Sequence, residues 1–165
     1  MEPVGRLPRV RVSVGSDHAG YELKGLLIEH LKASGHDVAD LGTNSTQPVD
    51  YPAFGAAVGR SVVSGDADLG LCICGTGIGI SVAANKVRGV RAAVVHDASS
   101  ARLAREHNDA NVICFGARLV GPEVAVDSLD AFIKSEFQGG RHMRRIEQIA
   151  ALEAESTDDP VRARF

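Results

Sequence analysis

Tryptophan is absent from this chain of 165 residues, and aromatic side chains are limited to five phenylalanines and two tyrosines. Aromatic rings supply the platforms on which single-stranded nucleic acids stack, so their scarcity argues against that function. The formal net charge is −3 with both signs mixed along the chain, whereas a nucleic-acid surface is strongly positive. We therefore expect no nucleic-acid partner.

Long apolar runs and paired cysteines are also missing. No run reaches the roughly 20 residues of a membrane-spanning helix, and the first residues lack the apolar core of a signal peptide. The three cysteines are an odd set inside strand-like runs, which is typical of free thiols in a reducing compartment. No Cys or His pair follows Cys72 and Cys74 at zinc spacing. These absences predict a cytoplasmic protein with no membrane partner and no metal.

What the sequence does contain is an alternation of short β-branched runs with helical patterns. The predicted strands cover residues 10–14, 38–41, 69–74, 90–95 and 111–115, and the predicted helices 20–34, 53–64, 80–87, 99–107 and 122–137. Such βαβ repetition predicts the α/β class, namely a Rossmann-like three-layer α/β/α domain with a five-stranded parallel sheet in the order 2-1-3-4-5. We expect one domain over 10–155, a disordered extension at 1–9 and a frayed tail at 156–165.

One further helical pattern, over residues 141–155, follows a Gly-Gly pair. Its apolar stripe consists of Met143, Ile146, Ile149 and Leu152. Because the sheet already has its helices, this stripe predicts a dimerisation helix that packs on a second copy of the chain. The alternative is a sixth helix folded back on its own domain.

Polar and reactive side chains follow the predicted strands. Asp17-His18 follows the first strand, Cys74-Gly75 the third, His96-Asp97 the fourth and Arg118 the fifth. Ligands of parallel α/β sheets bind at the carboxyl ends of the strands. The sequence therefore predicts the functional site at this edge of the sheet.

The run from Cys74 to Gly79 combines a thiol with three glycines and leads into a helix. Glycines let several backbone N–H groups approach one ligand, which makes an anion site. A thiol beside such a site indicates carbanion or enolate chemistry, and the alternative is a buried cysteine that ends a strand. A dinucleotide fingerprint is not supported, because its third glycine would fall on Ile80 or Val82.

Three other candidates each have a structural alternative. Asp17 suits acid–base chemistry, or it caps the helix that follows. His107 suits proton transfer, or it compensates the dipole at a helix end. Arg141 and Arg145 share a helix face and suit phosphate recognition, or they form a solvated face paired with Glu147.

Seven segments in order resemble the type B ribose-5-phosphate isomerase family, which also contains allose-6-phosphate and galactose-6-phosphate isomerases. The segments are Gly15–Gly20, Asp50–Pro52, Cys74–Gly79, Ala83–Lys86, Glu106–Asp109, Phe115–Arg118 and Gly139–His142. They run from about residue 10 to about residue 150.

The resemblance implies aldose–ketose isomerisation through a cis-enediolate without metal or other cofactor. Cys74 matches the family's base, and Ile80 stands where some members carry Glu, so the chain resembles the cysteine-base branch. Thr76 and the loop amides would hold the enediolate oxygen, while Asp17 and His107 match residues of hydroxyl proton transfer and ring opening. The implied substrate contacts are His18, Tyr51, Gly75, Gly77, Gly79, Asn108, Arg118, Arg141 and Arg145.

For function, the resemblance implies interconversion of D-ribose 5-phosphate and D-ribulose 5-phosphate in the pentose phosphate pathway. It also implies a homodimer or tetramer whose sites combine residues of two subunits. The first alternative is an isomerase of allose 6-phosphate, galactose 6-phosphate or a tetrulose phosphate, and loop 44–47 bears on that choice. The second alternative is a non-catalytic phosphosugar-binding module, against which the presence of Cys74, Asp17 and His107 argues.

Overall fold

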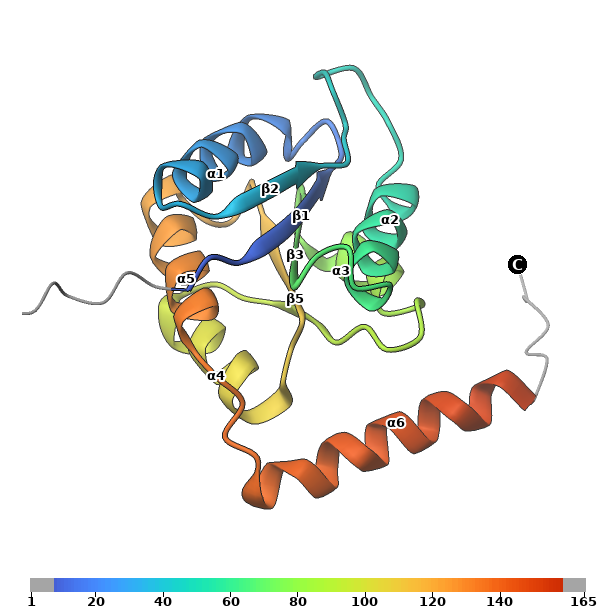
Figure 1. Ribbon diagram of the computed structural model, residues 1–165. Helices are drawn as coiled ribbons and strands as arrows, with labels where there is room; N and C mark the ends of the chain where they lie inside the picture. The colour runs from blue at the N-terminus through green and yellow to red at the C-terminus, as the bar shows by residue number, and fades with distance from the viewer. Residues whose placement is uncertain (1–7, 159–165) are drawn as a thin grey trace, which may run out of the picture.

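A parallel sheet lies between two layers of helices in a computed structural model that describes residues 8–158 (Figure 1). The strands are β1 (Arg11–Ser16), β2 (Asp37–Asp40), β3 (Leu69–Cys74), β4 (Ala92–Val94) and β5 (Val112–Gly116). The helices are α1 (Tyr21–Ala33), α2 (Pro52–Val63), α3 (Ile78–Ala84), α4 (Ala98–Asn108), α5 (Pro122–Lys134) and α6 (Met143–Asp158), with a 3-10 turn η1 (Gly140–His142) before α6.

All four strand pairings are parallel, and the order is β2-β1-β3-β5-β4. The predicted class and layers are confirmed, but the predicted order 2-1-3-4-5 is wrong at its last two positions. Every residue of β5 is buried, whereas β4 is short and half-buried. A wholly apolar segment suits a central strand, and a short one suits the edge, so β5 takes the inner place.

The free edge of β4 is covered by a side chain. The amide of Asn85 accepts a hydrogen bond from the Ala92 N–H (2.8 Å) and donates one to the Ala92 carbonyl (3.0 Å). It thereby imitates a neighbouring strand, which protects an edge that would otherwise pair with another chain. Asn85 therefore has a structural role at the edge of the sheet.

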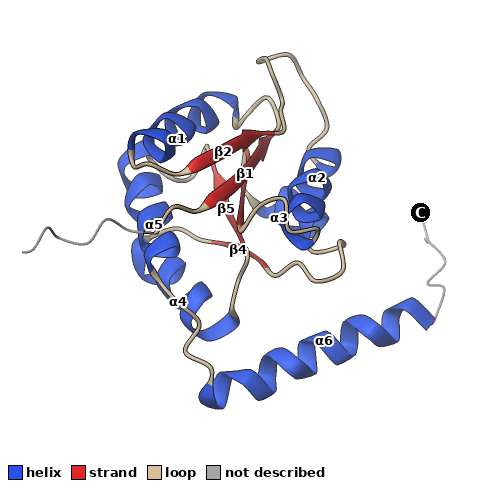
Figure 2. Cartoon of the chain, viewed as in Figure 1, coloured by secondary structure: helices blue, strands red, loops and turns tan. Residues whose placement is uncertain are grey.

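Two apolar cores flank the sheet (Figure 2). Strand residues alternate between the faces, so Leu71 and Ile73 pack toward α1, α4 and α5. Cys72 and Cys74 pack on the other face, in the core that contains Ile80 of α3 and Val58 of α2. This alternation places the Cys74 thiol beneath α2 and α3, at the last residue of β3.

Helix α6 lies outside the three layers and runs past the end of the domain (Figures 1 and 2). Its stripe residues remain open: Met143 is 44%, Ile149 47% and Leu152 64% exposed. No residue of α6 belongs to either apolar core, so within the described residues α6 is not packed as a sixth core helix of its own domain. The carboxylate of Glu153 accepts hydrogen bonds from the Gly89 N–H at 3.1 and 3.2 Å, which ties α6 to the loop before β4.

The ends of the chain fall partly outside the described residues. Of the predicted extension at 1–9, the structure describes only residues 8 and 9, and Arg9 forms an ion pair with Asp37. Of the predicted tail at 156–165, it describes residues 156–158, which still belong to α6. Within residues 8–158, every helix is too short or too polar to cross a membrane.

Candidate active site

The carboxyl ends of β1, β3 and β5 are joined by backbone hydrogen bonds beyond the strands themselves. Asp17 N donates to the carbonyl of Ile73 (3.2 Å), and Ala117 N donates to the carbonyl of Cys74 (2.9 Å). Arg118 N donates to the carbonyl of Gly75 (3.0 Å). The loops that follow these three strands therefore form one continuous surface, as the sequence predicts.

The Cys74 loop directs a backbone donor at sulfur. The Gly77 N–H lies 3.1 Å from Cys74 Sγ, and Cys74 is 3% exposed. Gly77 has φ +75°, and a Cβ there would strike the backbone of Phe115, so this turn requires glycine. A donor to sulfur stabilises negative charge on that atom. The loop therefore places one backbone donor directly on the Cys74 sulfur.

Side chains from two other loops lie directly against the glycines of this loop. A Cβ added at Gly75 would meet the Arg118 guanidinium at 2.9 Å, and one added at Gly79 would collide with the Tyr51 ring. Thr76 is exposed beside them, and its hydroxyl accepts a hydrogen bond from Ile78 N (3.2 Å). A cation, a phenol and a hydroxyl thus converge around the thiol loop.

Asp17 and His18 complete this edge. Asp17 is 6% exposed, and its carboxylate accepts a hydrogen bond from Gly20 N (3.1 Å), where the turn before α1 closes. Gly20 is the N-cap residue of α1, but the Asp17 carboxylate accepts from the Gly20 N–H, so Asp17 has the structural role at the start of this helix that the capping alternative describes. His18 Nδ1 lies 3.2 Å from the backbone nitrogen of Val49, which fixes the ring on the loop before α2.

The other predicted residues lie at the opposite edge of the sheet. Helix α4 runs antiparallel to the strands, from Asp97 at the carboxyl edge to Asn108 at the amino edge. Arg91, just before β4, donates from Nε to the Asn108 carbonyl (3.1 Å), and Gln138 N donates to the Glu106 carbonyl (3.0 Å). The turn that carries Arg141 therefore joins this amino edge too.

The predicted site is consequently divided within one chain. The carboxyl edge carries Asp17, His18, Tyr51, Cys74, Gly75, Thr76, Gly77, Gly79 and Arg118. The amino edge carries His107, Asn108, Arg141 and Arg145. Strand β5 separates the two groups by about 16 Å at 3.3 Å per residue. A single copy of the chain does not bring the two groups together, which leaves open the predicted site that combines residues of two subunits.

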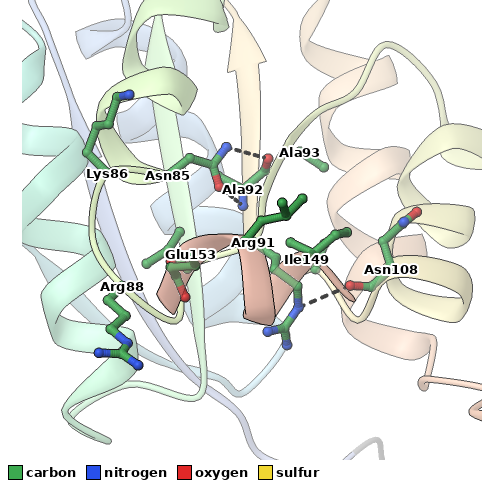
Figure 3. Close-up of a pocket in the computed structure, with 12 residues that line it drawn as sticks. Asn85, Lys86, Arg88, Arg91, Ala92, Ala93, Asn108, Ile149 and Glu153 are labelled. Atoms are coloured by element: carbon green, nitrogen blue, oxygen red, sulfur yellow. Dashed lines mark hydrogen bonds between the residues drawn. The ribbon is translucent and has the colours of Figure 1, made fainter. Parts of the chain in front are cut away.

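A hollow of about 620 Å³ opens beside the amino-edge group, between the β4 edge and α6 (Figure 3). Arg91 and Asn108 line it from the domain, and Ile149 and Leu152 line it from α6. The half-exposed stripe of α6 therefore faces an unfilled space next to predicted substrate contacts.

His142 is a residue that the sequence prediction left out of the site. Its ring stacks on His107 with 4.2 Å between centroids and 15° between planes, and it is 7% exposed. Burial lowers the pKa of His142, and the positive neighbours His107, Arg141 and Arg145 lower it further. A ring stack between residues distant in sequence leaves no local pattern, so no sequence signal identifies it.

Two other groups have structural roles. The Asp97 carboxylate caps α4 by accepting a hydrogen bond from Ser100 N (2.6 Å). In turn, the Ser100 hydroxyl accepts one from Asp97 N, which completes a capping box. Cys72 and Cys114 pair in register across β3 and β5 and are fully buried. The hydrogen bond with Cys72 raises the pKa of Cys114 well above its usual value, and burial raises it further. Cys114 therefore remains a neutral thiol.

Comparison with known proteins gives a consistent result. The model of the Ribose/Galactose Isomerase family matches residues 12–149. Ribose-5-phosphate isomerase B of Escherichia coli K12 is 46% identical over 143 residues, covering 87% of this chain and 96% of that protein. Galactose-6-phosphate isomerase subunit LacB of Clostridium acetobutylicum is 42% identical over 135 residues, covering 82% and 78%.

Solved structures agree. Ribose-5-phosphate isomerase B of Clostridium thermocellum superposes with a TM-score of 0.88 at 49% identity, covering 88% of this chain and 99% of that one. The Mycoplasma genitalium enzyme with bound ribulose-5-phosphate gives 0.84 at 45% identity, covering 88% and 97%. The chain belongs to the Ribose/Galactose Isomerase family.

Proposed function

We propose that this chain is a ribose-5-phosphate isomerase that interconverts D-ribose 5-phosphate and D-ribulose 5-phosphate. The observation that carries the proposal is the Cys74 thiol with the Gly77 N–H on its sulfur, adjoined by Asp17 and Arg118. The names of the relatives supply the substrate, and the loop geometry supplies chemistry that fits it.

In this proposal Cys74 acts as the base for proton transfer between adjacent carbons. The thiolate takes the proton from C2 of the open-chain aldose, and the electron pair moves to give an enediolate. The thiol then returns the proton to C1, while Asp17 carries the hydroxyl proton from O2 to O1. The Thr76 hydroxyl and the loop amides face the developing oxyanion, and a donor of that kind contributes roughly 3–4 kcal/mol in known enzymes.

The phosphate group is assigned to the arginines. Guanidinium groups bind phosphate oxygens in pairs of parallel hydrogen bonds, which fixes position as well as charge. Arg118, on the thiol-loop side, provides one such group, and His18 lies on the same edge. Arg141 and Arg145 provide the others from the amino edge of a second copy.

A second copy is part of the proposal because one chain separates the two groups of residues. The hollow beside Asn108 is unfilled, and α3, which follows the thiol loop, exposes Ile78 (57%) and Val82 (53%). If α3 of one copy enters the hollow of the other, its thiol loop approaches the partner's amino-edge residues. Burying these side chains supplies the hydrophobic contact that a homodimer needs.

We further assign the reaction to the cytoplasm and the pentose phosphate pathway. The names of the relatives describe isomerases of phosphorylated sugars. The cysteines of this chain are free thiols, which suits a reducing compartment.

A six-carbon phosphosugar is the alternative substrate. It is favoured by the likeness to the galactose-6-phosphate isomerase subunit and by an exposed loop at 44–47, before α2. The thiol-loop chemistry is the same for either sugar, so chain length is decided by the space around the far end of the substrate.

The experiment that tests the proposal is turnover of D-ribose 5-phosphate, D-allose 6-phosphate and D-galactose 6-phosphate at matched concentrations. A kcat/KM for the pentose at least 100-fold above the hexoses supports the proposal. A preference for a hexose transfers the assignment to the alternative. No turnover of any of the three contradicts isomerase activity on pentose and hexose phosphates.

A further inference from the structure

The turn that carries His142 is built to place one ring. Gly139 and Gly140 both have positive φ, 62° and 54°, and His142 N donates to the Gly139 carbonyl (3.0 Å). Just before this turn, Gln138 N donates a hydrogen bond to the carbonyl of Glu106, the residue that precedes His107. The turn is thus attached to the end of α4 directly beside the ring on which His142 stacks.

The stack joins a buried ring to a more open one. His142 is 7% exposed, whereas His107 is only half-buried at the last turn of α4. A half-buried imidazole at a helix end has several accessible rotamers. The parallel stack, with 4.2 Å between ring centroids, restricts the rotamers of His107, because only a rotamer that lays its ring flat on His142 keeps this contact.

The charge state of His142 suits its stack on His107. Its pKa is lowered by burial and by the positive groups around it, so His142 is neutral near pH 7. A neutral aromatic ring under His107 accommodates a positive charge on that imidazole through its π face, whereas a charged ring would repel it. The His142 ring therefore supports His107 through a flat, uncharged contact face.

We propose that His142 is a positioning residue that fixes the plane of the His107 imidazole for proton transfer to the sugar ring oxygen during ring opening. The inference rests on the proposed isomerase function and on the ring-opening role that the family resemblance implies for His107, which gives a proton to the ring oxygen as the C1–O bond of the furanose breaks. Orientation matters at this step because proton transfer requires hydrogen-bond geometry, and misplacement by about 1 Å costs ~100-fold in known enzymes.

Two substitutions of similar size separate positioning from simple space filling. His142→Phe keeps a flat ring under His107, and His142→Leu keeps the apolar volume without the ring. We expect His142→Leu to lower kcat about 10-fold with KM within twofold of wild type, and His142→Phe to retain at least half of kcat. His36→Leu is the matched control, since His36 is also buried (8% exposed) but lies at β2, and it should leave kcat unchanged.

A spectroscopic readout makes the test independent of turnover. In histidine-labelled protein, ring-current shifts of the His107 imidazole protons, assigned with His107→Gln, report the stack. These shifts should persist in His142→Phe and collapse in His142→Leu, at an oligomeric mass equal to wild type. Equal kcat for His142→Leu and wild type, or an equal loss in both variants, overturns the inference. An inactive wild type instead overturns the proposed function on which it rests.

Discussion

The sulfur of Cys74 differs in its surroundings from the sulfur atoms of the other two cysteines. Cys72 and Cys114 contact each other within the sheet, and the hydrogen bond between them together with burial raises the pKa of Cys114. Cys74 ends its strand and accepts from the Gly77 N–H. Chemistry on a sugar is therefore assigned to Cys74, and packing is assigned to the other two.

Replacement of Cys74 by alanine should abolish catalysis and spare binding. We expect kcat to fall at least about 100-fold, because the base is lost, while the loop amides and arginines still hold the substrate. Steady-state kinetics and substrate calorimetry measure the two effects separately. Cys72→Ala is the control, with near-normal kcat and a lower unfolding temperature from the cavity. Turnover of Cys74→Ala within tenfold of wild type would remove Cys74 as the base.

Arg141 should act on affinity. Arg141→Ala removes charged hydrogen bonds to phosphate, each of which contributes about 1.5–3 kcal/mol, so KM should rise about 10- to 100-fold. Arg144 is exposed on the same segment but outside the proposed phosphate set, so Arg144→Ala is the matched control and should keep its KM. An unchanged KM in Arg141→Ala, measured with ribose 5-phosphate, would exclude Arg141 from the phosphate site.

At the scale of elements, helix α4 connects the two edges of the sheet. Its start is fixed by Asp97, whose pKa is lowered by hydrogen bonds from the Ser100 backbone and side chain. Its end presents His107 to the stack with His142. The capping box and the stacked His107 ring therefore lie at opposite ends of one helix.

The Asp97 cap predicts a pH-dependent stability. Its pKa in the folded protein lies below the unfolded value of about 3.9, so its stabilisation is present above that value and is lost as pH falls through the folded pKa. Asp97→Ala should therefore unfold about 2–4 °C below wild type at pH 7, with the difference shrinking toward pH 3. Thermal unfolding of both proteins across this range measures it. A difference independent of pH would contradict the charged cap.

Sequence periodicity predicted most elements, because alternating β-branched runs and amphipathic helices are local patterns. It missed the inner place of β5, although that strand's uninterrupted burial is visible in its apolar sequence. Sequence periodicity also placed His107 at the end of a helix. Because that helix returns the chain to the start of the next parallel strand, its last residues lie at the amino edge of the sheet. The ring contacts of Tyr51 on Gly79 and of His142 on His107 depend on tertiary packing, which no local pattern encodes.

At the scale of the whole molecule, the division of the site predicts subunit complementation. Cys74→Ala removes the base from one edge, and His107→Ala removes the ring-opening residue from the other. In a mixed dimer, the intact Cys74 of one copy meets the intact His107 of its partner, so one of the two sites is complete. Each variant alone should be nearly inactive, and an equal mixture, unfolded and refolded together, should recover about a quarter of wild-type activity by random pairing.

The same experiment discriminates against a site formed within one chain. If Cys74 and His107 served the same site of a single copy, every subunit of the mixture would lack one of them, and refolding would restore nothing. Mixing Cys74→Ala with Asp17→Asn is the matched control, because both residues lie at the carboxyl edge and should not complement. Recovery in the first mixture with none in the second is the pattern that the separation of the two edges by the length of β5 requires.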